Sequence, residues 1–318
     1  MKAAIVFKAG LAPVYGDFKE PIPAPGETRI AVVAAALSPV VKARAAGSHY
    51  SSPTDFPFVV GIDGVGRLDD GRRVYFILPK APFGSMSQTA VVPSSQCVIL
   101  PDGLDDITAA AIANPGLSSW AALKERARFA RGETILINGA TGTSGRLAVQ
   151  IAKYLGAKKV IATGRTPSAL QSLKALGADE TIGLVEDTNV LDHVFKSHFQ
   201  SGINVVLDYL WGKSAERLLI SGSQAVKEGV PIRFVQVGNA SGANINLPAA
   251  VLRSAAIELI GSGLGSVPFT RIVGVVDELL QATVKADFKI QTTTVPLSEV
   301  QQAWRGEALF PRIVFTVS

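Results

Sequence analysis

Six short runs between residues 134 and 263 are apolar at consecutive positions. They read TILING, KKVIATG, ETIGL, INVVLDYL, IRFVQVG and IELIGSG, and polar or helical stretches separate them. Between the first two, Leu147, Ile151 and Leu155 recur four residues apart, which predicts an apolar stripe on a crossover helix. Strands that are apolar at consecutive positions need cover on both faces, so this pattern predicts a doubly wound, parallel α/β sheet.

The first 115 or so residues follow another pattern, in which apolar runs alternate with stretches rich in proline and glycine. KAAIVF, ETRIAVVAAALS and GRRVYFIL predict strands of a compact, mostly antiparallel β region. A helical pattern spans residues 272–283, and the strand-like segment after it is expected to return to the first region. The predicted domains are 1–115, 116–265 and 266–318, the last comprising the linking helix and the return.

Composition limits the range of partners. The net charge is +5, but Lys and Arg are scattered, which predicts a mildly basic surface and no nucleic-acid partner; a local basic site for a phosphorylated ligand is the alternative. No apolar run reaches the ~18 residues that span a bilayer and no secretion signal opens the chain, so we expect no membrane partner and a cytoplasmic location. The single cysteine, Cys97, excludes a disulfide framework and a multi-cysteine zinc cluster.

The stretch GATGTSGR, residues 139–146, lies between the first apolar run and the crossover helix. Its glycines are three apart: Gly139 permits a tight turn, Gly142 lets phosphates approach bare backbone, and Gly145 lets helix and strand pack closely. The free N–H groups at the start of the helix then face the anion. The sequence therefore predicts a dinucleotide pyrophosphate site that also includes Ala140, Thr141, Thr143 and Ser144.

The end of the second run, ATGRTPS, bears on the choice of cofactor. Sites that prefer NAD usually place an acid there, which binds the ribose 2′-hydroxyl. This chain has Gly164 and Arg165, and no acid before Asp179. A guanidinium would pair with a 2′-phosphate, and the hydroxyls of Thr163, Thr166 and Ser168 could add to it. The predicted cofactor is NADPH rather than NADH; the alternative is a solvated loop arginine.

The stretch ILINGATGTSGRLAVQIAKYLGAKKVIATG resembles the nucleotide-binding unit of the medium-chain dehydrogenase/reductases, in their zinc-free quinone oxidoreductase-like branch. PFVVGIDGVGRL, DGRRVY, VILPDGLDDITAAAIANPGLSSWAALKE and VPLSEVQQAW extend the resemblance over nearly the whole chain, in family order. The resemblance implies a GroES-like β domain, built from the start and the tail, beside a Rossmann domain, with the active site in the cleft between them.

The resemblance also bears on metal content. Zinc-dependent members carry an early cysteine ligand and a Gly-His-Glu sequence, where this chain has Ile62 and Asp63 in place of His and Glu. Its three histidines lack a ligand spacing, so we expect no metal. Zinc-free relatives usually read Asn-Pro-x-Asp near an early strand end, and here Ser38 and Val41 stand at the Asn and Asp positions.

Hydride transfer from NADPH to a quinone or an α,β-unsaturated carbonyl fits a site without a metal, because the product anion is already fairly stable. The catalytic candidates are Tyr50 and Ser38, in a loop that the resemblance places at the cleft together with Lys42 and Arg44, and Asn114 at the junction between the domains. At the ends of later strands, the cofactor-binding candidates are Asp208, Gly238, Asn239 and Gly263.

Two alternatives stay open. One is an enoyl-type double-bond reductase that acts on a larger acyl or biosynthetic intermediate. The other is a protein that senses NADPH without turnover. A small-molecule electrophile is the expected substrate, and a homodimer through IELIGSG is expected because an open apolar edge strand is a liability.

Overall fold

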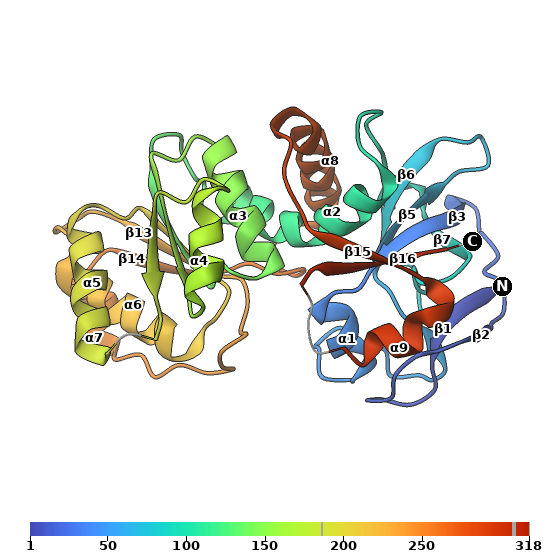
Figure 1. Ribbon diagram of the computed structural model, residues 1–318, viewed down its shortest axis with the longest axis horizontal. Coiled ribbons are helices and arrows are strands. Elements are labelled where there is room, and N and C mark those ends of the chain that lie inside the picture. Colours follow the sequence, from blue (N-terminus) through green and yellow to red (C-terminus); the bar gives the residue numbers. More distant parts are fainter. Residues whose placement is uncertain (186, 307–309, 318) are drawn as a thin grey trace. The chain divides into compact units, whose positions relative to one another are not determined.

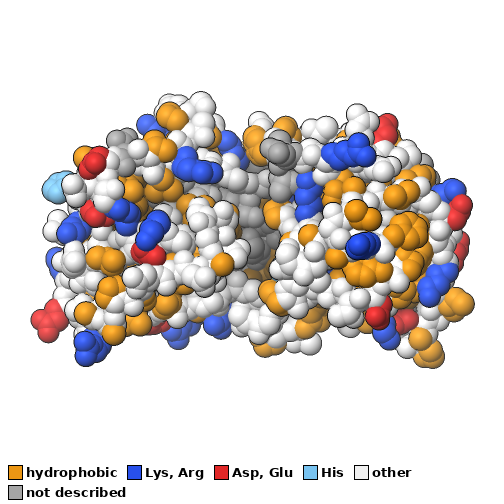
Figure 2. Space-filling model, turned by 90° about the horizontal axis from the view of Figure 1, so that it is seen from below, with side chains coloured by type: hydrophobic (Ala, Val, Ile, Leu, Met, Phe, Trp, Pro, Cys, Tyr) orange, Lys and Arg blue, Asp and Glu red, His pale blue; other side chains and the backbone are white. Residues whose placement is uncertain are grey.

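The computed structural model of the chain describes residues 1–185, 187–306 and 310–317. They form two compact units. The terminal unit comprises Met1–Asn114 and Val273–Ser318, and the central unit comprises Pro115–Ile272. No helix in the described part of the chain is long and apolar enough to cross a membrane. On the face shown in Figure 2, Lys and Arg side chains are scattered over each unit among acidic and uncharged groups.

The central unit is built on a six-stranded parallel sheet with the order β11-β10-β9-β12-β13-β14. These strands are the six apolar runs, which confirms the predicted sheet, and the order reverses between β9 and β12 as in doubly wound folds. Their bounds are β9 Thr134–Asn138, β10 Lys159–Gly164, β11 Glu180–Gly183, β12 Val205–Asp208, β13 Ile232–Gln236 and β14 Ile257–Gly261.

Helices cover both faces of this sheet, which is why its strands are apolar at consecutive positions. In Figure 1, α3 and α4 lie on one side and α5, α6 and α7 on the other. Leu136, Phe195 and Leu218 belong to the core beneath the second group of helices. The bounds are α3 Thr143–Tyr154, α4 Pro167–Lys174, α5 Thr188–Gln200, α6 Gly212–Ala225 and α7 Ala249–Ser254.

The terminal unit contains a sheet of order β2-β1-β4 and a seven-stranded sheet of order β15-β16-β3-β5-β6-β8, with β7 also paired to β3. Strand β16 pairs antiparallel with β3, so the tail returns to the first region as the sequence predicts. The bounds are β1 Lys2–Val6, β2 Val14–Asp17, β3 Glu27–Ala36, β4 Phe58–Val59, β5 Asp63–Arg67, β6 Arg73–Ile77, β7 Thr89–Pro93, β8 Cys97–Ile99, β15 Thr292–Pro296 and β16 Arg312–Thr316.

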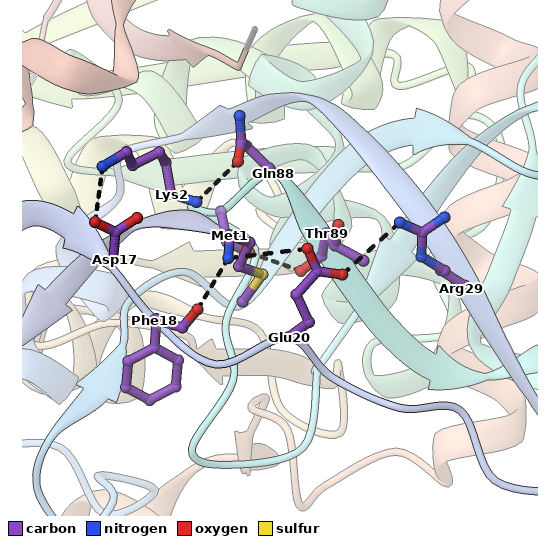
Figure 3. Close-up of polar contacts among 9 residues, drawn as sticks. Met1, Lys2, Asp17, Phe18, Glu20, Arg29, Gln88 and Thr89 are labelled. Carbon is purple, nitrogen blue, oxygen red and sulfur yellow. Dashed lines mark hydrogen bonds and ion pairs between the residues drawn. The ribbon is translucent and has the colours of Figure 1, made fainter.

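Polar contacts hold the first strand in place (Figure 3). The Lys2 N–H donates to Gln88 Oε1 at 2.8 Å, and Lys2 Nζ binds the Asp17 carboxylate at 2.9 Å. The Met1 amine donates to the Phe18 carbonyl at 2.9 Å, so the start of β1 is tied to the end of β2.

Short helices in the terminal unit correct two expectations. Residues 39–45, expected as part of a loop, form α1 (Pro39–Ala45), because Ser38 caps the helix and Pro39 suits its first position. In the tail, expected to be strand-like, η3 (Leu297–Glu299) and α9 (Val300–Trp304) follow β15. The other elements are η1 Ser94–Gln96, α2 Asp106–Ala121, the π-helical turn η2 Ala122–Arg126 and α8 Phe269–Ala286.

Candidate functional site

The three glycines of the turn after β9 occupy three different environments. Gly139 has φ +84°, which a side chain rarely adopts. A Cβ added at Gly145 would lie 2.5 Å from the Ala140 Cα, so α3 packs directly on the turn. A Cβ added at Gly142 would meet nothing within 4 Å, so the backbone there is open to an approaching ligand.

The start of α3 faces the same open space. Gly142 is its N-cap and provides no side chain to accept hydrogen bonds from the first N–H groups of the helix. These donors and the positive end of the helix dipole suit a pyrophosphate. The turn therefore fits the phosphates of a dinucleotide, with the backbone of residues 139–145 as the expected donor set.

A network of buried polar side chains at the ends of the neighbouring strands holds the turn in place. Thr163 Oγ1 donates to Asn138 Oδ1 at 2.7 Å and accepts from the Gly139 N–H at 3.0 Å. Asn138 Nδ2 donates to Asp208 Oδ1 at 2.7 Å and to Ser214 Oγ at 2.9 Å. The network joins the ends of β10, β9 and β12, so it fixes the turn relative to the sheet. Sequence reasoning missed Asn138, although an amide that ends an apolar strand was a visible signal.

This network corrects the roles expected for two side chains. Thr163 is fully buried and uses its hydroxyl inside the network, so it does not add a hydroxyl to a 2′-phosphate site. Asp208 is also fully buried, and its carboxylate accepts from the N–H groups of Leu210 and Trp211 as well as from Asn138. Burial raises the pKa of Asp208. Its side chain shapes the loop after β12 instead of facing a cofactor.

The end of β10 presents its polar groups to solvent. Arg165, Thr166 and Ser168 are exposed, and Arg165 makes no hydrogen bond or ion pair with another residue of the described chain. Gly164 is needed there because an added Cβ would lie 2.5 Å from Thr141 Cγ2. The next acid, Asp179, is bound by Lys153 Nζ at 2.7 Å, so it does not compete for Arg165.

A second arginine, which sequence reasoning missed, connects the turn to α4. Arg146 Nε donates to the Thr141 carbonyl at 3.0 Å, and its Nη2 donates to Ser172 Oγ at 2.8 Å. Its position directly after the third glycine of the turn could have identified Arg146 from the sequence. Arg146 therefore holds the turn and α4 together on the side of Arg165.

Later strands bring Asp208 and Gly238 together, because the Gly238 N–H donates to the Asp208 carbonyl at 3.1 Å. Asn239 is exposed beyond β13. Gly263, beyond β14, is fixed by a hydrogen bond from its N–H to Ser266 Oγ at 2.8 Å. The cofactor contacts of Gly238, Asn239 and Gly263 remain predictions.

Tyr209 follows β12, and its hydroxyl lies 2.7 Å from Ser119 Oγ of α2. Burial raises the pKa of Tyr209 to about 12, so the phenol remains protonated near neutral pH. Ser119 Oγ in turn donates to the carbonyl of Ser144 at 3.4 Å. The pair links α2 to the first turn of α3.

The catalytic candidates of the sequence lie in different settings. Ser38 is 1% exposed, and its Oγ accepts from the Val41 N–H at 3.3 Å, so we correct it from a catalytic candidate to a helix cap. Tyr50 is 77% exposed, and its ring centroid lies 4.1 Å from that of His49. Asn114 is half-buried within α2. Catalytic roles for Tyr50 and Asn114 remain predictions.

The terminal unit contains a shallow pocket that is open to solvent. The lining side chains are apolar apart from that of Arg44, and the backbone and Arg44 make more of the surface that faces the pocket polar than apolar. The pocket is lined by Val41, Arg44, Pro53, Phe58, Val59, Val60, Gly61, Ile62, Ala81 and Phe83.

The side chains of Asp63 and Cys97 are poorly suited to bind a zinc ion. Asp63 is buried and accepts from the Tyr75 hydroxyl at 2.9 Å. Burial raises the pKa of Cys97 to about 11, which favours the thiol over the thiolate that zinc requires. In the described part of the chain, no three His, Cys, Asp or Glu side chains are grouped to hold a metal ion.

The chain is similar in sequence and in structure to known dehydrogenases and quinone reductases. A family described as zinc-binding dehydrogenase matches residues 145–281, a stretch that contains neither Asp63 nor Cys97. The probable NADPH-dependent quinone reductase tdiC of Emericella nidulans is 31% identical, with 93% of each chain covered. The quinone oxidoreductase of Sus scrofa is 30% identical over 66% of each chain. The quinone oxidoreductase of Thermus thermophilus, whose complex with NADPH has also been solved, superposes with a TM-score of 0.82 at 25% identity, with 99% of this chain and 100% of that chain covered.

Proposed function

Because the chain belongs to the medium-chain dehydrogenase/reductase superfamily, in its quinone oxidoreductase-like branch, we propose that it is a zinc-independent reductase that uses NADPH to reduce a quinone or an α,β-unsaturated carbonyl. The observation that carries the proposal is the open turn at Gly142 together with Arg165 beyond the next strand, which is exposed and has no partner among the described residues. NADPH, when bound, supplies the hydride, and water supplies the proton that completes the reduction.

The residues of this chain bind the cofactor and the acceptor and orient them for hydride transfer. The backbone of residues 139–145 holds the pyrophosphate, and Arg165 pairs with the 2′-phosphate. Asn138 and Thr163 keep the turn in its binding conformation through their buried hydrogen bonds. The pocket of the terminal unit, which Arg44 lines, holds the acceptor.

A screen of NADPH consumption tests this proposal. The purified protein is supplied with simple quinones and short enones, once with NADPH and once with NADH. We expect turnover of at least one acceptor with NADPH. Turnover only of long acyl substrates would favour an enoyl-type reductase, and binding of NADPH without any turnover would favour a sensor.

The Arg165→Ala variant is expected to weaken NADPH binding about tenfold to a hundredfold, because a charge-assisted hydrogen bond is worth about 1.5–3 kcal/mol. NADH lacks the 2′-phosphate, so its affinity should not change. The measurement is calorimetric titration with each cofactor. Arg253→Ala, at an exposed arginine on α7, is the matched control. Unchanged NADPH affinity in Arg165→Ala would refute the assignment.

We expect the protein to be a homodimer through β14, which is the outer strand of its sheet. Leu259 on this strand is 40% exposed, and an open apolar edge favours pairing with a second copy. Light scattering should give twice the mass of one chain, and Leu259→Lys should shift it toward the monomer. A monomeric wild-type mass at every concentration would remove the expectation.

A further inference from the structure

We propose that Arg44 binds an acidic oxygen group of the substrate, a carboxylate or an ionised hydroxyl on a quinone ring, so that the enzyme prefers anionic acceptors to neutral ones. The inference rests on the proposed function and adds a substrate class to it. The pocket concerned lies wholly within the terminal unit.

Arg44 is the one charged side chain among the residues that line the pocket. Arg44 lies in the last turn of α1, and the other side chains that line the pocket are apolar. A half-buried guanidinium in such surroundings loses hydration, and burial lowers the pKa of Arg44 accordingly. Some compensating group is therefore expected.

Other groups of the described chain offset the lost hydration of the Arg44 guanidinium only weakly. Within the described part of the chain, its guanidinium makes one hydrogen bond, from Nη1 to Ser51 Oγ at 3.3 Å. No carboxylate in the described part of the chain forms an ion pair with it. A guanidinium carries five N–H donors in a fork that matches two oxygens of one acid, so most of this capacity is available to a ligand.

The neighbours of Arg44 hold it without neutralising it. His49 Nδ1 lies 2.9 Å from Ser51 Oγ and accepts from the Ser51 N–H at 3.2 Å. Burial and the charge of Arg44 both lower the pKa of His49, so the imidazole is neutral near pH 7. Ser51 is thereby oriented toward Arg44, and the positive charge at the pocket remains that of one guanidinium.

The test uses paired acceptors that differ only in charge: a short enone carboxylate with its methyl ester, and a hydroxyquinone that is ionised at neutral pH with its methoxy analogue. The wild-type kcat/KM should be about tenfold to a hundredfold higher for the anion in at least one pair. The pair that shows the preference identifies which acid group is bound. Arg44→Met should remove the preference, so that kcat/KM for the anion falls to the value for the neutral member of the same pair. Arg72→Met, at an exposed arginine of the same unit that pairs with Asp70, should retain the preference.

Two outcomes separate this inference from the proposed function. If neutral acceptors are reduced and neither pair shows a preference, or if Arg44→Met keeps it, the inference is wrong and the function stands. If no acceptor is reduced, the proposed function is wrong, and ligand binding then tests the inference by itself. Calorimetry should detect binding of the saturated analogue of the enone carboxylate to the wild type, but not binding of its methyl ester. Arg44→Met should bind neither compound. Thermal unfolding confirms that each variant is folded.

Discussion

Replacing Arg312 with methionine is expected to lower the free energy of unfolding by about 1–3 kcal/mol near pH 8, and by clearly less near pH 5. Arg312 is 3% exposed on β16, and its charge acts on Asp63 of β5. Arg312 Nε and Nη2 and Asp63 Oδ1 have no hydrogen-bond partner in the described part of the chain. Removing the cation leaves a buried carboxylate with only the Tyr75 hydroxyl.

The pH dependence follows from the direction of the Asp63 shift. Burial raises the pKa of Asp63 from 3.8 to about 6, although Arg312 and Tyr75 act in the opposite direction. The folded protein therefore holds this proton more tightly than the unfolded chain does. The stability that this group contributes is full below the unfolded pKa and is lost as the pH rises through about 6. Near pH 5 the acid is mostly neutral, so the loss of Arg312 matters less.

Chemical denaturation of wild type and Arg312→Met at both pH values measures this effect. The double variant Asp63→Asn with Arg312→Met is the control, and it should lose less stability than the sum of the single variants, because neither charge is left alone. A loss below about 1 kcal/mol, or the same loss at both pH values, would contradict the account.

The second large effect is expected at Gly142. Gly142→Val should weaken NADPH binding about tenfold to a hundredfold, because its side chain occupies the open space in front of α3. Stability should change by no more than about 1 kcal/mol, since Gly142 has φ −78° and ψ 172°, which suit valine, and an added Cβ meets nothing within 4 Å. Calorimetry with NADPH and thermal unfolding together measure the two effects.

Gly145→Ala provides the matched contrast three residues away. Its Cβ would lie 2.6 Å from the Gly139 carbonyl oxygen, so α3 must shift away from the turn. We expect this variant to lose both stability and NADPH affinity. If Gly142→Val binds NADPH like the wild type, the open space is not the phosphate site.

The parallel sheet could be predicted from the sequence because both of its faces are covered. Consecutive apolar positions such as 135–137 suit a strand that packs against helices on both sides, and turn residues bound each run. The glycine turn was predictable for a similar reason, since each glycine has its own steric requirement. Helix α1 was missed although Ser38 followed by Pro39 is a recognisable helix start.

The side chains of the site were harder to predict. The sequence places Thr163 and Asp208 at strand ends but does not say which way each side chain points, and both point into the protein. The charges of Asp63 and Arg312 act on each other although the two residues are far apart in the chain, so this interaction exists only once β16 has joined the sheet that contains β5. The sequence does not show that Arg44 lines a pocket, which became clear only from the fold of the terminal unit.

Paired calorimetric titrations of the purified wild-type protein with NADPH and with NADH test the central claim most directly. The account predicts one saturable NADPH site per chain and an affinity at least about tenfold higher than for NADH. No detectable binding of either cofactor, or equal affinity for both, would contradict it.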